Sequence, residues 1–335
     1  MIIFLLLSLY ITYTIIKQQL NALHTNLKGS GCMNIAIAGG TGFIGTALTE
    51  YFISQGHQVY ILTRTPKEKK ENVHYVQWLV SGSKPVESLP PLDALINLAG
   101  DSIGSGRWTE QKKERILKSR IKATNASITL LQQLEHKPNV FINASAIGIY
   151  GHSDTHTFTE DHVEGGENNF LKEVVLQWET EALKADDLGI RTVLPRLGLV
   201  LDENEGALPK MLLPYRLFAG GALGSGDQWY SWVHIQDVVR LIDFIIQTNE
   251  IEGAINVTSP QPVQMKEMGK AIAAVLKRPH WLPTPAFALK LLLGEMSSLL
   301  LQGQRVLPEK ALSYGFKFNY STIDDALQHL LKQDH

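Results

Sequence analysis

A glycine-rich turn between a short apolar run and a helical pattern constrains the fold of this chain more than any other feature. The apolar run reads NIAIA over residues 34–38, and the turn reads GGTGFIG over residues 39–45. Apolar periodicity after the turn predicts a helix that ends near Gln55, before Gly56. A strand, a glycine turn and a helix in this order are typical of a dinucleotide-binding βαβ unit.

Each glycine of the turn has its own expected role. Gly39 permits the tight turn, Gly42 lets the backbone approach a pyrophosphate, and Gly45 lets the helix pack closely on the strand. The helix N-terminus adds unpaired N–H groups and the positive end of the helix dipole. We therefore expect the phosphates of a dinucleotide to bind here, and the alternative is a glycine-rich turn without a ligand.

Strands and helices alternate along the body of the chain. Strands are predicted at 57–62, 73–78, 94–98, 140–144 and 191–194, and helices at 109–134 and 170–185. Because parallel strands need crossover connections, this order predicts an α/β fold. It is a Rossmann-type, doubly wound parallel sheet with a smaller, mostly helical C-terminal substrate lobe.

The expected domain boundaries follow the change of pattern after residue 200. We expect a leader at 1–32 and an NAD(P)-binding domain at 33–200, with a returning strand near 254–258. Substrate-lobe segments follow at 201–280. A small C-terminal helical domain is expected at 281–335, and it contains a leucine-rich helical stretch at 287–302.

The residue at the end of the second strand bears on the choice of cofactor. The strand ends Ile61-Leu62-Thr63-Arg64, where an NAD site usually has Asp or Glu for the ribose hydroxyls. A guanidinium matches a 2′-phosphate and cannot replace a carboxylate. The sequence therefore favours NADP over NAD, and a solvated surface arginine is the alternative interpretation.

Charge and cysteine usage exclude several classes of protein. The chain has 31 Lys plus Arg and 33 Asp plus Glu, so no basic excess favours nucleic-acid binding. Cys32 is the single cysteine, which excludes an intramolecular disulfide and a zinc site built from cysteines. No HExxH pattern occurs, and we expect no metal. We read Asp237 as a helix cap with His234 packed beneath it.

The N-terminal segment has two interpretations. Residues 2–16 are apolar and uncharged, but a membrane span needs roughly 17–20 such residues. Lys17 and Lys28 follow the run, as for an anchor that leaves the body in the cytoplasm. Met33 stands directly before the first strand, as for an upstream extension from a mis-assigned start. We expect a cytoplasmic protein, with membrane anchoring as the alternative.

Several motifs carry a resemblance to the extended short-chain dehydrogenase/reductase superfamily. Besides the glycine turn, they are NLAG at 97–100, SAIGIYG at 145–151 and HIQD at 234–237. The chain is most similar to its NAD(P)-dependent epimerase/dehydratase-like subgroup of "epimerase family" proteins. The motifs of that subgroup are GRWT at 106–109, SRI at 119–121, GSGDQW at 224–229, GEM at 294–296, QRVLP at 304–308 and GF at 315–316.

The resemblance implies a set of cofactor contacts. They are Gly39, Thr41, Gly42, Phe43, Ile44, Gly45, Thr63, Arg64, Leu98, Ala99, Gly100 and Arg120. Arg107 and Lys113 add two cations near Arg120, and all three are candidates for binding a phosphate or carboxylate. A solvated basic face is the alternative.

The usual proton-transfer pair of the superfamily is missing. Its members use a Tyr with a Lys four residues later, and this chain has that spacing at Tyr13–Lys17, ahead of the nucleotide fold. In the helix that should carry the pair, Phe170 or Leu171 occupies the Tyr position. Val174 or Val175 occupies the Lys position. Standard dehydrogenase or epimerase chemistry therefore lacks its usual donor.

Two hydroxyls remain as catalytic candidates. Ser145 stands where the superfamily has a substrate-orienting hydroxyl, and Tyr150 lies close enough in sequence to replace the lost phenol. The alternatives are a Ser that caps local backbone and a Tyr that packs on the sheet. Trp229, Tyr230 and Trp232 either wall an aromatic pocket or belong to the core.

Two classes of function stay open at this point. One is an NADPH-dependent oxidoreductase or epimerase-like enzyme that acts on an unknown small molecule with an unusual proton donor. The other is a non-catalytic NADPH-binding regulatory or assembly protein. Membrane contact is expected only where residues 1–32 form an anchor, and a homodimer is the oligomer left open.

Overall fold

The computed structural model describes residues 31–68, 71–162 and 164–331. The chain divides into two compact units, Met1–Met33 and Asn34–His335, and the helices and strands named below belong to the second. The apolar run at residues 2–16 and the Tyr13–Lys17 spacing lie outside the described residues. Within the described ranges, no helix has both the length and the apolar character needed to cross a bilayer.

A parallel sheet forms the centre of the second unit. Its strand order is β12-β8-β5-β4-β1-β2-β3, and the short β6 (Ser145–Ala146) also pairs with β8. Each neighbouring pair is parallel, which confirms the predicted doubly wound α/β fold. The strands are β1 (Asn34–Ala38), β2 (Gln58–Thr63), β3 (Val73–Gln77), β4 (Ala94–Asn97), β5 (Val140–Asn143), β8 (Arg191–Leu197) and β12 (Gly253–Val257).

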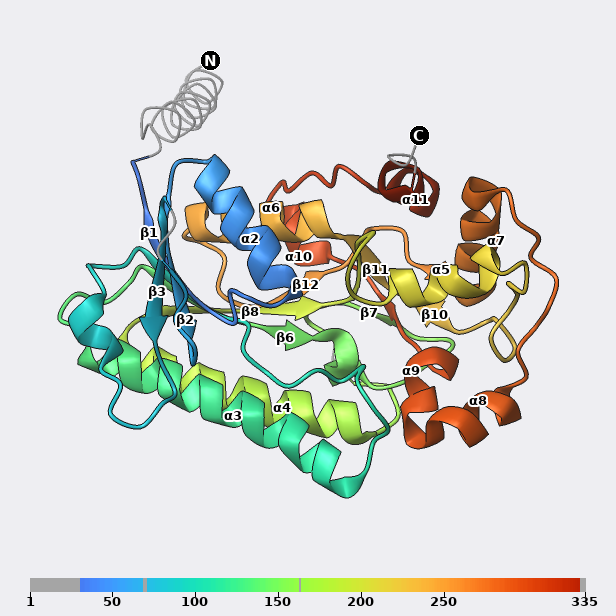
Figure 1. Ribbon diagram of the computed structural model, residues 1–335, viewed down its shortest axis with the longest axis horizontal. Coiled ribbons are helices and arrows are strands. Elements are labelled where there is room, and N and C mark those ends of the chain that lie inside the picture. The colour runs from blue at the N-terminus through green and yellow to red at the C-terminus, as the bar shows by residue number, and fades with distance from the viewer. Residues whose placement is uncertain (1–30, 69–70, 163, 332–335) are drawn as a thin grey trace, which may run out of the picture. The chain divides into compact units, whose positions relative to one another are not determined.

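Helices cover both faces of the sheet (Figure 1). α3 (Glu110–Gln133) and α4 (Phe170–Ala182) lie on one face, and α2 (Phe43–Ser54) and α6 (Ile235–Gln247) lie on the other. Thr109 caps α3, because its side chain accepts a hydrogen bond from the Lys112 N–H.

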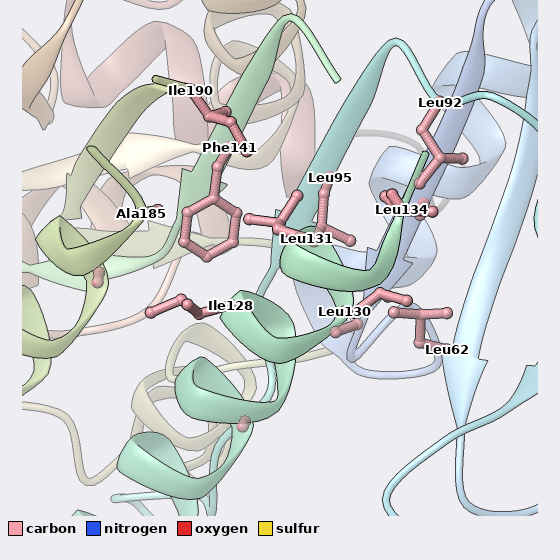
Figure 2. Close-up of a cluster of buried hydrophobic side chains, with 14 of the residues drawn as sticks. Leu62, Leu92, Leu95, Ile128, Leu130, Leu131, Leu134, Phe141, Ala185 and Ile190 are labelled. Atoms are coloured by element: carbon pink, nitrogen blue, oxygen red, sulfur yellow. The ribbon is translucent and has the colours of Figure 1, made fainter. Parts of the chain in front are cut away.

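The main core lies between the sheet and α3. Figure 2 shows Leu131 of α3 beside Leu95 of β4 and Phe141 of β5, all fully buried. β4 and β5 are buried at every position, as expected for strands covered on both faces. This packing fixes the carboxyl ends of β1, β4 and β5, from which the candidate site is built.

The remaining elements form a lobe with its own core around Trp232, Leu212, Met268 and Leu327. Its helices are α5 (Leu208–Arg216), α7 (Met265–Leu276), α8 (Ala286–Leu293), α9 (Ser298–Leu301), α10 (Glu309–Ser313) and α11 (Ile323–Leu331). Three short strand pairs complete it: β9 (Leu199–Leu201) with β11 (Trp232–His234), β10 (Trp229–Tyr230) with β13 (Val263–Gln264), and β7 (Thr157–Phe158) with β14 (Arg305–Val306).

The leucine-rich stretch predicted at 287–302 is helical but interrupted. Gly294 has a φ of +60°, and it ends α8 before the short 3₁₀ helix η4 (Gly294–Ser297) and α9. Glycine adopts this backbone conformation without the steric penalty of other residues, so the break is encoded locally. The other 3₁₀ helices are η1 (Pro85–Ser88), η2 (Ile147–Tyr150) and η3 (Leu183–Leu188).

Candidate functional site

The glycine turn has two positions where the backbone is closely approached and one that is open. Gly39 has a φ of +80°, and a Cβ there would lie 2.9 Å from the Leu98 carbonyl carbon. A Cβ on Gly45 would lie 2.2 Å from the Gly39 oxygen, so the helix packs this closely on the turn because residue 45 has no side chain. A Cβ on Gly42 would meet only the Gly39 oxygen, at 3.4 Å. Gly42 therefore faces open space, where a ligand can approach its backbone.

The N-terminus of α2 is receptive to an anion. The N-cap is Gly42, and within the described part of the chain no side chain caps the helix and no acidic residue lies in its first turn. Thr46 donates the first hydrogen bond of the helix, to the Gly42 carbonyl, so the preceding N–H groups, including those of Phe43 and Ile44, have no partner within the helix. Thr41 and Gly42 are exposed. Phosphate oxygens suit such a helix end.

Arg64 lies at the same edge of the sheet. Ala38, the last residue of β1, pairs in register with Leu62 of β2 and with Asn97 of β4, so the three strand ends are level. The Arg64 side chain is exposed. It makes no hydrogen bond or ion pair with any residue that the structure describes. Thr63, beside it, binds the Thr65 N–H at 3.3 Å.

Backbone and amide contacts fix the turn after β4. The Leu98 N–H donates to the Ala38 carbonyl at 2.9 Å, and the Ala99 N–H donates to Asn97 Oδ1 at 3.1 Å. Asn97 Nδ2 in turn donates to Asn143 Oδ1 at 2.7 Å. These bonds hold the segment 98–100 against the glycine turn. Leu98 and Ala99 are half-buried and Gly100 is exposed.

Arg120, from α3, packs against the turn after β4. Its Nη1 donates to the carbonyls of Asp101 and Ile116, both at 3.0 Å, and its guanidinium lies 5.1 Å from the Trp178 ring centre. A Cβ on Gly100 would lie 3.1 Å from Arg120 Cγ. Burial lowers the pKa of Arg120 to about 10. Arg120 Nη1 is therefore already hydrogen-bonded to two backbone carbonyls, and a contact between Arg120 and a cofactor stays a prediction.

The other two candidate cations bind the protein as well. Arg107 donates to the backbone carbonyls of Leu291 and Leu292 in α8. Lys113 forms ion pairs with Glu110 and Glu295. The three cations therefore do not converge on one ligand position.

Ser145 and Tyr150 belong to one buried network. Ser145 Oγ donates to Glu179 Oε1 at 2.5 Å. Arg196 donates to both oxygens of Glu179, at 2.9 and 3.0 Å, and its Nη1 donates to the Tyr150 hydroxyl at 3.0 Å. That hydroxyl donates to Asn256 Oδ1 at 2.7 Å. The network joins β6, η2, α4, β8 and β12.

Neither candidate hydroxyl is open to solvent. Ser145 is 1% exposed and Tyr150 is 0% exposed, and both hydroxyls have protein partners. Burial raises the pKa of Tyr150 to about 12, which makes the phenol harder to ionise. In this conformation the two residues connect strand ends and helices, and their catalytic role stays a prediction.

The positions of the missing Tyr and Lys hold packing residues. Val174 and Val175 are buried, and the Phe170 ring packs edge-on against Trp108 with ring centres 5.3 Å apart. Leu171 lies beside Gly148, where a Cβ would be 3.3 Å from that of Leu171.

Glu179 and Arg196 were not predicted as site residues from the sequence. The available signal was a carboxylate on the apolar face of α4, four residues after Val175 and three before Ala182, all three of them buried. Arg196 is likewise a charge inside a strand buried at Thr192–Arg196. Two opposite buried charges need partners, and pairing them was the inference available.

The aromatic cluster and the HIQD motif have structural roles here. Tyr230 and Trp232 are buried in the core of the lobe, as the packing interpretation expects. The predicted cap at Asp237 is wrong, because His234 Nδ1 accepts from the Gln236 N–H at 3.0 Å and caps α6 itself. Asp237 instead binds the N–H groups of Asn319 and Tyr320. Among the described residues no group of three metal-binding side chains occurs.

Comparison with known families and proteins gives matches over most of the chain. Residues 35–258 match the NAD dependent epimerase/dehydratase family, and residues 284–330 match a domain of unknown function (DUF1731). "Epimerase family protein YfhF" of Bacillus subtilis is 50% identical over 300 residues, which cover 89% of this chain and 98% of that protein.

Two solved structures are similar in fold and sequence. Human epimerase family protein SDR39U1 (isoform 2), solved with NADPH, has a TM-score of 0.80 and 29% identity, covering 90% of this chain and 99% of that one. A nucleoside-diphosphate sugar epimerase from Corynebacterium glutamicum has a TM-score of 0.71 and 30% identity, covering 90% of this chain and 58% of that one.

Proposed function

Because the chain belongs to the NAD-dependent epimerase/dehydratase family, we propose that it binds NADPH along the carboxyl edge of its sheet and uses it in oxidoreductase or epimerase-type chemistry on a small molecule. The observation that carries the proposal is the pairing of a helix N-terminus at Gly42 with the exposed Arg64, neither of which has a side-chain partner among the residues that the structure describes. The human relative solved with NADPH supports the choice of cofactor.

The residues present fit this cofactor group by group. The open space beside Gly42 admits a pyrophosphate, and the N–H groups of Phe43 and Ile44 suit its oxygens. The Arg64 guanidinium suits a 2′-phosphate. Ala99 and Gly100 would wall the same groove. When bound, the cofactor supplies a hydride from its nicotinamide ring.

The buried network gives Ser145 and Tyr150 a positioning role in this proposal. Ser145 starts the turn after β5, and Glu179 and Arg196 hold its hydroxyl in place. Direct proton donation by Tyr150 would require the network to open, and its raised pKa suits an acid rather than a base at neutral pH. Groups that touch the substrate are then expected on the half-buried segment that follows Ser145.

A second candidate function is NADPH binding without turnover. The observation that favours it is the packing of hydrophobic side chains at the positions of the usual Tyr and Lys, with Val174 and Val175 buried. A regulatory or assembly protein needs the groove and Arg64 but no solvent-facing proton donor.

The cofactor assignment is tested by the variant Arg64→Asp. Loss of a hydrogen bond to a charged group costs about 1.5–3 kcal/mol, so NADPH affinity should fall roughly 10- to 150-fold while NADH affinity changes little. Fluorescence titration of both cofactors measures this. Lys84→Asp is the control, because Lys84 is exposed and pairs only with Glu87 among the described residues. Equal losses for NADPH and NADH in Arg64→Asp would contradict the assignment.

Turnover separates the two functions. We expect NADPH oxidation with at least one member of a broad panel of carbonyl compounds, or epimerisation within a panel that includes nucleoside-diphosphate sugars, the substrate class named for the Corynebacterium neighbour. Stoichiometric NADPH binding without turnover on either panel would favour the non-catalytic function.

A further inference from the structure

Exposed apolar side chains gather where α5 ends and where α7 connects to α8. Leu213 and Leu217 of the α5 region are 57% and 68% exposed, and Phe218 is 55% exposed. Trp281 and Leu282, beyond α7, are 64% and 45% exposed. Monomeric proteins rarely leave so many large apolar side chains together in water without a binding role. We call these five residues the docking patch.

Hydrogen bonds tie the two halves of the docking patch together. Trp281 Nε1 donates to the Phe218 carbonyl at 2.9 Å, and the N–H groups of Trp281 and Leu282 both donate to the Gly220 carbonyl. The Arg278 guanidinium lies 4.5 Å from the Phe218 ring centre. The patch is therefore one surface made from two distant segments.

The backbone at Phe218 is strained. Its φ of +59° lies in the left-handed region, which a bulky residue adopts at a cost on the order of 1–3 kcal/mol. The Ala219 N–H donates to the Pro214 carbonyl and the Phe218 N–H to the Tyr215 carbonyl, so this conformation is the one that ends α5. The helix end places the Phe218 side chain, more than half exposed, on the surface.

A second apolar ridge follows on α8. Phe287 and Leu291 are 74% and 80% exposed and lie four residues apart, hence on one face of the helix, and Leu292 is 66% exposed. α5, α7 and α8 all lie at the end of the unit away from β3 (Figure 1). An apolar helix face normally points to the core, and here it points to solvent.

Cations prevail within the two segments that form the docking patch and the α8 ridge, although Glu295 lies just beyond α8 and lines a pocket there with Glu110, Glu114 and Glu173. No Asp or Glu occurs at positions 206–226 or 268–294. The same two segments carry six exposed cations, and none of them forms an ion pair within the described part of the chain: Lys210, Arg216, Lys270, Lys277, Arg278 and Lys290.

We propose that the docking patch and the α8 ridge bind the surface of a membrane that carries anionic headgroups. Exposed Trp, Phe and Leu enter the boundary between headgroups and acyl chains, and Lys and Arg beside them attract lipid phosphates. A second copy docked by a twofold axis would bring the same cations face to face. Side chains more than half exposed project outward, whereas a peptide-binding groove needs concave walls. The contact is independent of residues 1–32.

Tryptophan fluorescence tests the contact in the full chain. Trp281 is exposed, Trp229 is half-buried, the other four tryptophans are buried, and residues 1–32 contain none. Vesicles of phosphatidylglycerol with brominated phosphatidylcholine should quench the emission, and brominated phosphatidylcholine alone should not. Trp281→Phe should remove the quenching. Because Trp281 reports only on this surface, binding through the leader does not mimic the result.

Matched variants locate the contact. Phe287→Ser should raise the lipid concentration needed for half-maximal quenching about tenfold or more, from the loss of one buried apolar side chain. Leu176→Ser, at an exposed leucine of α4, should leave it unchanged. Absence of quenching by anionic vesicles, or quenching that persists in Trp281→Phe, would overturn the proposal. Self-association that Phe287→Ser abolishes, without quenching, would assign the surface to a second copy instead.

Discussion

The glycines of the turn differ in whether the fold tolerates a side chain at their position. Gly42 has a φ of −86°, which any residue adopts, and open space lies beside it. Gly42→Val should therefore keep the free energy of unfolding nearly unchanged while abolishing NADPH binding, because the added side chain blocks the pyrophosphate. Chemical denaturation and fluorescence titration measure the two effects separately. Wild-type NADPH affinity in this variant would mean that the turn does not bind phosphate.

Gly45→Ala is the matched comparison. Its Cβ would overlap the Gly39 oxygen, so helix and turn must separate, and we expect a loss of stability of roughly 1–3 kcal/mol together with weaker binding. The contrast between loss of binding alone in Gly42→Val and loss of both in Gly45→Ala distinguishes a ligand-facing glycine from a packing glycine.

The buried ion pair is the residue-scale feature with the largest expected effect on stability. Glu179→Gln leaves Arg196 as an uncompensated buried charge, which costs about 3–5 kcal/mol. Glu181→Gln, on the same helix, breaks a pair with the exposed Lys184 and should cost about 1 kcal/mol or less. Urea denaturation compares the two variants. Equal losses of stability would show that the Glu179 network is not the structural link described above.

The same network explains which site residues the sequence could reveal. The glycine turn and Arg64 are predicted as cofactor contacts from local motifs, because strand, turn and helix are consecutive. Glu179 and Arg196 come close to Ser145 only once α4 and β8 pack beside β6. No local sequence pattern therefore predicts the Ser145–Glu179–Arg196 network.

At the scale of single elements, the start of α6 predicts a pH dependence. His234 caps the helix and stacks on Tyr320 with ring centres 3.9 Å apart. Its Nε2 atom lies 3.1 Å from Nδ1 of His329, within hydrogen-bond distance. Burial lowers the pKa of His234 to about 3 from an unfolded value of about 6.5. Below about pH 6.5 the unfolded chain therefore takes up a proton that the folded chain does not, and stability falls as the pH decreases toward about 3.

Urea denaturation at several pH values measures this effect. Linkage limits the contribution of one histidine to about 1.4 kcal/mol per pH unit. His234→Asn, which keeps a capping side chain but cannot titrate, should have a shallower dependence between about pH 6.5 and about pH 5. An unchanged slope would assign the pH dependence to groups other than His234.

Most elements were predictable because their signals are local. Alternating apolar runs and amphipathic stretches predict most strands and helices to within a residue or two. The exceptions are β8, which continues to Leu197 beyond the predicted end at 194, and α4, which ends at Ala182 rather than at 185. The cap of α6 was not predictable from residue preferences, because His is not a usual N-cap residue and Asp237 lies three residues later. Tertiary contacts with the segment before α11 decide that Asp237 binds Asn319 and Tyr320 instead.

At the scale of the whole molecule, the parallel sheet can be predicted from the alternation of strands and helices along the chain. The strand pairings of the lobe cannot be predicted in this way. Segments at 199–201, 229–234 and 263–264 pair across long stretches of sequence, and such pairings have no period to detect. The exposure of the docking patch and the α8 ridge could not be predicted from the sequence either, since a leucine-rich helix predicts burial. It is known only once the remaining elements are packed.

The crystal structure of the NADPH complex tests the central claim most directly. We predict pyrophosphate oxygens within about 3 Å of the N–H groups at the start of α2, and the 2′-phosphate within about 3 Å of the Arg64 guanidinium. The nicotinamide should lie near the half-buried segment that follows Ser145, with the Ser145 and Tyr150 hydroxyls still in their network. A 2′-phosphate remote from Arg64, or a dinucleotide bound away from the glycine turn, would contradict the account.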